Sequence, residues 1–311
     1  MWYTLALMDF SLSSCELCPR RCGVDRAHGQ VGYCGSGALP RLFRWGPHFG
    51  EEPPVSGTRG SGTLFFSHCT MRCVYCQNAK WSSGGLGEDI PIAELTARMR
   101  ALAEQGCHNW NLVSPTPWLP QIAEAAAPLL AEGIRLPFVY NTSGYERAET
   151  LEAFAQLADV ALADLRYAKA ASAAEGSGAA DYVPVARRAI RWFWDRLGPL
   201  ELDGEGIARR GLIVRILVLP GREDEAAESL TWLRNELGAG VAVSLMAQYN
   251  PVGRAKDLPG WNRRVAREAF EPLAGLVEDL GFEQGWVQPC EDETAERMLG
   301  DDMAAGYGEV R

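Results

Sequence analysis

The chain has 311 residues, of which 47% are hydrophobic and 23% charged, a balance typical of a globular protein. Its net charge of −10, with no basic stripe to offset it, argues against a nucleic-acid partner. No apolar run is long enough to cross a bilayer, and the first residues lack the pattern of a signal peptide, so we expect no membrane association.

Nine cysteines are present, and seven of them fall in two tight groups. This grouping indicates metal ligation in a reducing cytoplasm rather than a disulfide framework, so we expect a cytoplasmic protein. The first group is spaced C-x2-C-x3-C-x11-C and comprises Cys15, Cys18, Cys22 and Cys34. Four soft ligands in a glycine-rich loop suit a zinc ion or an auxiliary iron–sulfur cluster, and four free thiols are the alternative.

The segment 41–59 is rich in Gly, Pro and aromatic residues and is interpreted as an extended connector. The chain is therefore expected to divide into a Cys-rich metal-binding segment with its connector, residues 1–55, and a main domain, residues 56–311.

The second group, Cys69, Cys73 and Cys76, is spaced C-x3-C-x2-C and follows an apolar run over 62–67 that predicts a short buried strand. Iron–sulfur clusters are normally held by four thiolates, so three from one loop leave one iron open for chemistry. The alternative is a structural zinc site with His68 as the fourth ligand, although zinc usually has paired C-x2-C ligands.

From residue 62 onward, apolar strands alternate with amphipathic helical patterns. The predicted strands are 62–67, 109–113, 136–140, 159–163, 212–218 and 241–246, with 282–287 as a further candidate. Repeated strand–helix alternation predicts an α/β fold with a parallel sheet and outer helices. Six such units fit a partial (β/α)6 TIM-type barrel, in which the carboxyl ends of the strands carry the site.

Polar residues follow four of these strands, and each set is a candidate for binding a small ligand. They are Ser114 and Thr116; Asn141, Thr142 and Ser143; Asp164 and Arg166; and Gln248, Tyr249 and Asn250. Helix capping and an ordinary ion pair are the alternatives. Arg215 lies inside an apolar strand, where burial requires an anionic partner, either a ligand carboxylate or Asp164. Residues 170–180 are small and are predicted to form a mobile loop over the barrel mouth or a disordered surface insertion.

The C-x3-C-x2-C spacing, with Tyr75 before the last cysteine, resembles the signature of the radical S-adenosylmethionine (SAM) superfamily. The resemblance implies a [4Fe-4S] cluster on Cys69, Cys73 and Cys76, with SAM chelated by the open iron. Reductive cleavage of SAM would then give a 5′-deoxyadenosyl radical that abstracts a hydrogen atom. The chain also resembles the pyruvate formate-lyase activating enzyme-like subgroup. This resemblance rests on the C-x2-C-P-R-x-C-G segment at 15–23 and on further matching segments spread over most of the chain.

The same resemblance implies contacts with SAM. Tyr75 and Gln77 would flank the adenine, and Gln248, Tyr249 and Asn250 match a Pro-Tyr-His element near the adenosine. Ser114 and Thr116 stand where a Gly-Gly-Glu-Pro motif contacts the SAM amino group. Residues 141–143 match an Asp-Thr-Asn-Gly loop, and Asp164 with Arg166 matches an Asp-Leu-Lys element; Arg215 is also assigned to cofactor binding.

Three departures from the family pattern bear on the substrate. The Gly-Gly-Glu residues are absent, Asn141 replaces an aspartate, and His68 stands where glycine is usual. The sequence thus predicts a radical SAM oxidoreductase that abstracts hydrogen from an unidentified protein or small molecule, with flavodoxin or ferredoxin as electron donor. The alternatives are an activase that generates a glycyl radical on a pyruvate formate-lyase-like partner, and a non-enzymatic iron–sulfur or zinc protein.

Overall fold

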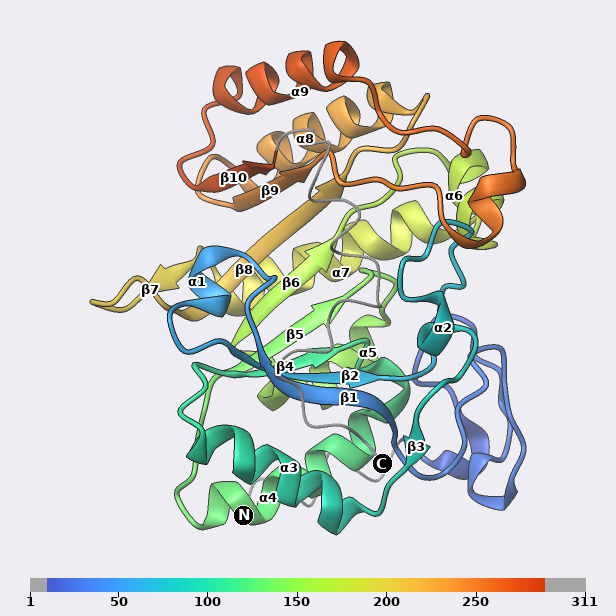
Figure 1. The fold of residues 1–311 in the computed structure, drawn as a ribbon, viewed down its shortest axis with the longest axis vertical. Helices are drawn as coiled ribbons and strands as arrows, with labels where there is room; N and C mark the ends of the chain where they lie inside the picture. The colour runs from blue at the N-terminus through green and yellow to red at the C-terminus, as the bar shows by residue number, and fades with distance from the viewer. Residues whose placement is uncertain (1–9, 289–311) are drawn as a thin grey trace.

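The computed structural model describes residues 10–288 (Figure 1). Its strands are β1 (Arg41–His48), β2 (Ser61–Phe66), β3 (Glu88–Asp89), β4 (Trp110–Val113), β5 (Phe138–Thr142), β6 (Val160–Asp164), β7 (Glu201–Leu202), β8 (Ala208–Leu217), β9 (Ala242–Met246) and β10 (Gly285–Gln288). Its α-helices are α1 (Pro53–Ser56), α2 (Ala79–Ser82), α3 (Ile92–Glu104), α4 (Leu119–Ala131), α5 (Ala148–Ala153), α6 (Ala170–Ser177), α7 (Tyr182–Leu197), α8 (Glu223–Leu237) and α9 (Arg267–Asp279).

One curved sheet organises the chain, in the order β10-β9-β8-β6-β5-β4-β2-β1-β3, with β7 added beside β8. All neighbours from β2 to β10 along this path are parallel, whereas β1 and β3 are antiparallel additions at one edge. The two ends of the order, β10 and β3, lie at separate edges, so the barrel is partial. The predicted partial TIM-type α/β barrel is therefore confirmed.

The strands predicted from periodicity all have counterparts, but two predicted segments differ. Residues 41–48, interpreted as part of a connector, form β1, which pairs with β2 and thus joins the main sheet. Gly46 and Pro47 inside it gave the signal of a turn. The prediction of a loop at 170–180 is wrong: Ala-rich residues favour helix, and α6 forms there and ends at the left-handed Gly178.

Apolar side chains fill the interior of the partial barrel at the end where the strands begin. Side chains alternate along a strand, so residues two apart face the same side. Val55 of α1 packs against the inward-facing Val139, Leu162 and Ile213 and closes this end with a small apolar cluster. Figure 1 shows α1 near the beginnings of β6 and β8. Two residues further along the same strands, the inward positions become polar: Asn141, Asp164 and Arg215.

The outer face of the sheet is covered by helices, with α3 packed on α4 and α8 on α9. The blue N-terminal segment lies to one side, near α2 and β3 (Figure 1). No helix among residues 10–288 is long and apolar enough to span a membrane.

Replacing Val55 with alanine tests the importance of the apolar plug. Val55 is fully buried, so Val55→Ala leaves a cavity and should lower the free energy of unfolding by about 2 kcal/mol. Urea denaturation followed by circular dichroism measures the change. Val31, which is 57% exposed, provides the control: Val31→Ala should change stability by less than about 0.5 kcal/mol. Equal losses for both variants would contradict a role for the plug.

Candidate active site

The three-cysteine loop leaves the carboxyl end of β2 and is held in a strained backbone conformation. His68 and Arg72 adopt φ angles of +70° and +68°, in the left-handed region that disfavours side chains. Such strain is concentrated at functional sites, where the surrounding structure imposes it. A positive φ at this position would suit glycine without strain, whereas His68 carries a side chain there.

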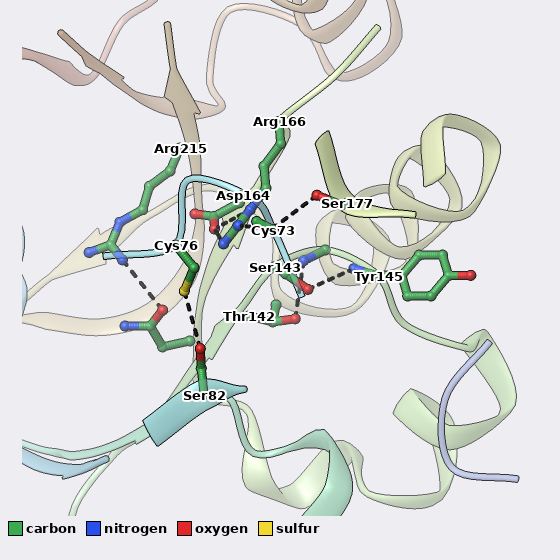
Figure 2. Close-up of polar contacts among 12 residues, drawn as sticks. Cys73, Cys76, Ser82, Thr142, Ser143, Tyr145, Asp164, Arg166, Ser177 and Arg215 are labelled. Atoms are coloured by element: carbon green, nitrogen blue, oxygen red, sulfur yellow. Dashed lines mark hydrogen bonds and ion pairs between the residues drawn. The ribbon is translucent and has the colours of Figure 1, made fainter. Parts of the chain in front are cut away.

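Cys73 is buried and receives two hydrogen bonds. Arg166 Nη1 and Ser177 Oγ each lie 3.0 Å from its Sγ atom, and Arg166 is also paired with Asp164 (Figure 2). A chain of hydroxyl groups continues from Ser177 through Tyr167 to Tyr75, at 2.6 and 2.9 Å. Donors of this kind stabilise a thiolate and tune a sulfur-ligated metal centre.

Helix α6 packs on the three-cysteine loop and holds it by two hydrogen bonds. The backbone N–H of Val74 donates to the Gly176 carbonyl at 2.8 Å, and Ser177 of the same helix reaches Cys73. Gly176 is required by close packing, because a Cβ atom there would lie 2.4 Å from the Tyr167 hydroxyl and 2.6 Å from the Trp261 ring. The segment 170–180 is therefore part of the wall around the cysteines.

The other two cysteines of the loop, Cys69 and Cys76, are partly buried. Burial raises the pKa of the Cys69 thiol to about 12, and the neighbouring Cys73 raises it further. Burial likewise raises the pKa of Cys76, whose Sγ is hydrogen-bonded to Ser82 Oγ at 3.2 Å. Metal binding would have to displace these thiol protons, as is usual for thiolate ligands.

Within residues 10–288, no three His, Cys, Asp or Glu side chains form a group that could hold a metal ion. A [4Fe-4S] cluster makes a different demand, because each thiolate binds a separate iron and the sulfur atoms need not converge on one point. Three sulfurs in one loop, of which Cys73 is buried and has two donors while Cys69 and Cys76 are partly buried, fit such a cluster better than a single zinc ion. His68, within the same range, likewise belongs to no group with the three cysteines that could hold a single metal ion.

A cavity of about 280 Å³ opens inside the barrel and adjoins a smaller one of about 180 Å³ that reaches Cys76. All but one of the candidate SAM-contact residues predicted from the sequence line these two cavities. They are Tyr75, Gln77, Ser114, Asn141, Thr142, Ser143, Asp164, Arg166, Arg215, Gln248, Tyr249 and Asn250. The ends of β4, β5, β6 and β9 thus bring together residues from distant parts of the sequence.

Thr116 is the exception, because it is buried beside the cavity. Its hydroxyl donates to Glu146 Oε1 at 2.6 Å, and Thr142 donates to the same oxygen. Burial raises the pKa of the Glu146 carboxyl to about 7. Sequence analysis missed Glu146, which ties the loop after β4 to the loop after β5.

Arg215 has partners that the sequence did not suggest. Its Nε donates to Glu52 Oε1 at 2.7 Å, and its Nη2 contacts both Glu51 and Glu52. Asp164, one of the two candidate partners of Arg215, pairs with Arg166 instead. Glu51 and Glu52 come from the segment interpreted as a connector, and both line the larger cavity.

An aromatic wall surrounds Tyr75. Its ring stacks on Trp261 at a centroid distance of 5.3 Å and lies 5.5 Å from Tyr249. Tyr249 donates through its hydroxyl to the Trp261 carbonyl at 2.6 Å. Trp261 lies beyond the last predicted polar segment and had no motif to single it out.

Within the described part of the chain, the four N-terminal cysteines form no disulfide, and they do not come together as a group that could hold a single metal ion. Cys22 is exposed, and its Sγ accepts a hydrogen bond from the Tyr33 backbone N–H at 3.3 Å. The thiol of Cys34 donates a hydrogen bond to Ser36 Oγ. Burial raises the pKa of Cys18 to about 12, and the nearby Cys34, Glu146 and Cys15 raise it further. A second metal at these cysteines stays a prediction.

Comparisons with known proteins bear on the fold. No family model matches the chain. An uncharacterised protein of Methanocaldococcus jannaschii is 26% identical over 278 residues, which cover 87% of this chain and 76% of the relative. The structure of HydG, a maturase of the [FeFe]-hydrogenase, aligns with a TM-score of 0.50 and 11% identity over 74% of this chain and 52% of its own. The chain thus matches about half of HydG, and this likeness shows a shared fold.

A domain of a pyruvate-formate lyase-activating enzyme from Bacteroides vulgatus aligns more loosely. Its TM-score is 0.35 and its identity 11%, over 63% of this chain and 90% of that domain. This alignment is too loose to add to the fold comparison.

Gly176→Ala should disturb the cysteine loop. The added methyl group meets Tyr167 and Trp261, so α6 must move and its bonds to Val74 and Cys73 should weaken. We expect a loss of about 1–3 kcal/mol in unfolding free energy and less iron bound after reconstitution. Gly275 in α9 has no atom within 4 Å of its Cβ position, so Gly275→Ala should stabilise by up to about 1 kcal/mol and leave iron content unchanged. Normal iron content in Gly176→Ala would contradict the role given to α6.

Glu146 should make stability depend on pH. Its pKa is about 7 in the folded chain against 4.5 for an ordinary glutamate, so the folded state binds more protons between these values. Stability should therefore fall as pH rises from about 4.5 to 7, by up to about 3 kcal/mol, and stay level above pH 7. Glu146→Gln should remove this fall in urea titrations at several pH values. Glu124→Gln, at an exposed site of α4, should retain it.

Proposed function

We propose that the protein is a radical SAM enzyme that abstracts a hydrogen atom from its substrate. One observation carries the proposal: the C-x3-C-x2-C loop lies at the carboxyl end of a barrel strand, beside a cavity lined by polar residues from the ends of neighbouring strands. This is where a barrel of this type places its chemistry. The fold shared with HydG supports it.

In this proposal Cys69, Cys73 and Cys76 hold a [4Fe-4S] cluster. When bound, the cluster supplies the electron that cleaves SAM to methionine and a 5′-deoxyadenosyl radical. The chain supplies orientation and electrostatics. Arg166 and Ser177 donate to Cys73 Sγ, and hydrogen bonds to a ligand sulfur favour the reduced state of an iron–sulfur centre.

The polar strand ends would hold SAM. Ser114 adopts a φ of +57° after β4, so the backbone turns sharply at the edge of the cavity. Hydroxyl and amide groups at 141–143 lie across from it on β5, and both strand ends line the same cavity. With no Gly-Gly-Glu motif in the sequence, these groups would bind the amino acid part of SAM, and Tyr75, Gln77, Gln248 and Asn250 would surround the adenosine.

The substrate is proposed to be a small molecule or a side chain of a protein. Activation of a glycyl-radical partner requires a mouth that admits a peptide loop. The helical α6, packed on the cysteine loop, removes the mobile segment that made this alternative attractive. A one-electron donor such as flavodoxin or ferredoxin is proposed as a partner, and the N-terminal cysteines as a zinc or auxiliary cluster site.

The proposal is tested by anaerobic reconstitution with iron and sulfide, reduction with dithionite, addition of SAM and measurement of 5′-deoxyadenosine. Wild-type protein should form the product, and Cys73→Ala should reduce it by at least about 100-fold, because one of three ligands is lost. Cys107→Ala removes a buried cysteine outside the site and should retain full activity. No SAM binding by a fully reconstituted protein would leave only the non-enzymatic alternative.

A further inference from the structure

The larger cavity has a charged floor, formed by Glu51, Glu52, Asn141 and Arg215, which we call the acidic floor; the fully buried Asn111 is hydrogen-bonded to it from outside the cavity lining. Glu51 and Glu52 precede α1 and enter the barrel above the apolar plug. Asn111 Nδ2 donates to Glu51 Oε1 at 2.8 Å, and Asn141 Nδ2 donates to the same oxygen at 3.2 Å. Arg215, whose side chain is drawn in Figure 2, binds both glutamates.

By formal charge, the acidic floor has two carboxylates for one guanidinium group. Burial tends to raise the pKa of Glu52, but the adjacent Arg215 outweighs it and holds the pKa below the usual value, so Glu52 is ionised. Burial opposes the charge on Arg215, yet Glu52 and Glu51 hold its pKa well above the usual range. Two carboxylates thus share one guanidinium, with only 8% and 1% of their side chains exposed.

Among the described residues that line the cavity, no other group cancels this charge. Asp164 and Arg166 pair with each other at 3.0 Å and are neutral together. Burial lowers the pKa of His48, so its imidazole is neutral at pH 7. A buried excess charge is costly unless a counter-charge accompanies it.

The hydrogen bonding of Asn111, a partner of Glu51, is also incomplete. Asn111 is fully buried, and its amide nitrogen is used by Glu51, but its Oδ1 has no hydrogen-bond partner. A buried acceptor without a donor costs about 1–3 kcal/mol. The excess carboxylate on the acidic floor requires a cation. An ammonium or guanidinium group in the cavity supplies that cation, together with hydrogen-bond donors for the carboxylate oxygens.

We propose that the acidic floor binds the ammonium or guanidinium group of the substrate, which is an aliphatic amine or the side chain of a lysine or arginine. This inference rests on the proposed function, and it names the substrate class of the same site. The floor lies deep in the barrel and the cysteines at its mouth, so a substrate anchored by its cationic end would present its carbon chain toward the cysteine loop. A glycine Cα has no such group, so the inference also separates the protein from an activase.

The test is calorimetric titration of the reconstituted protein, with and without SAM. Pentan-1-amine is compared with pentan-1-ol and pentanoate, which share its chain but not its charge. A blocked Gly-Lys-Gly peptide distinguishes a protein side chain from a free amine. Glu51→Gln removes the excess charge and keeps the contacts of Arg215 with Glu52. The matched control is Glu132→Gln, the same substitution at the exposed end of α4.

We expect the amine, the peptide or both to bind at least about 10-fold more tightly than the alcohol and the carboxylate. Glu51→Gln should weaken that binding about 10-fold and leave SAM affinity within about twofold, whereas Glu132→Gln should match wild type. Equal binding of amine and alcohol by wild type overturns the inference without any variant. So does a loss of SAM affinity in Glu51→Gln that equals the loss of amine affinity, or competition by sodium that abolishes amine binding.

The outcome is separable from that of the proposed function. Formation of 5′-deoxyadenosine without selective amine binding would reject the acidic floor as the substrate site and retain the radical chemistry. Selective amine binding without SAM binding would reject the radical chemistry, and the floor would remain a binding site for cations of this class.

Discussion

The interior of an open barrel must be packed with side chains. In this protein they come in part from residues 51–55, a segment outside the barrel strands. Val55 packs among the inward residues of β5, β6 and β8, and the two glutamates just before it are carried into the same space. Buried carboxylates require a cation, and Arg215 provides it from β8. The plug fills the end of the barrel at which the strands begin, and this ion cluster lines the cavity beyond it.

The mouth of the cavity is organised by a second set of charges. Arg166 connects the end of β6 to Cys73, and Ser177 connects α6 to the same sulfur. The two donors approach from different elements, so the cysteine loop is held relative to both the sheet and its covering helix. The left-handed residues His68 and Arg72 are tolerated because this framework determines their conformation.

The sequence predicted the features that depend on local patterns. Apolar periodicity located the parallel strands, and their ends located most of the residues that line the cavity, because parallel strands end on the same side of a sheet. Contacts between distant segments could not be predicted in this way. The partners of Arg215 lie 163 and 164 residues away, in a stretch whose glycines and prolines indicated a connector. Glu146 had no motif, and the small residues of α6 are compatible with either helix or loop until packing decides.

The long separation between Glu52 and Arg215 also bears on how the chain folds. During synthesis the glutamates and α1 emerge far ahead of β8, so the first half of the barrel exists for a time without the cation that neutralises its interior. Burying the carboxylates at that stage would be unfavourable, and the plug is therefore expected to close only when β8 docks. A fragment that ends before residue 208 should leave α1 undocked, and completion of the barrel is governed by contacts of high sequence separation, which form slowly.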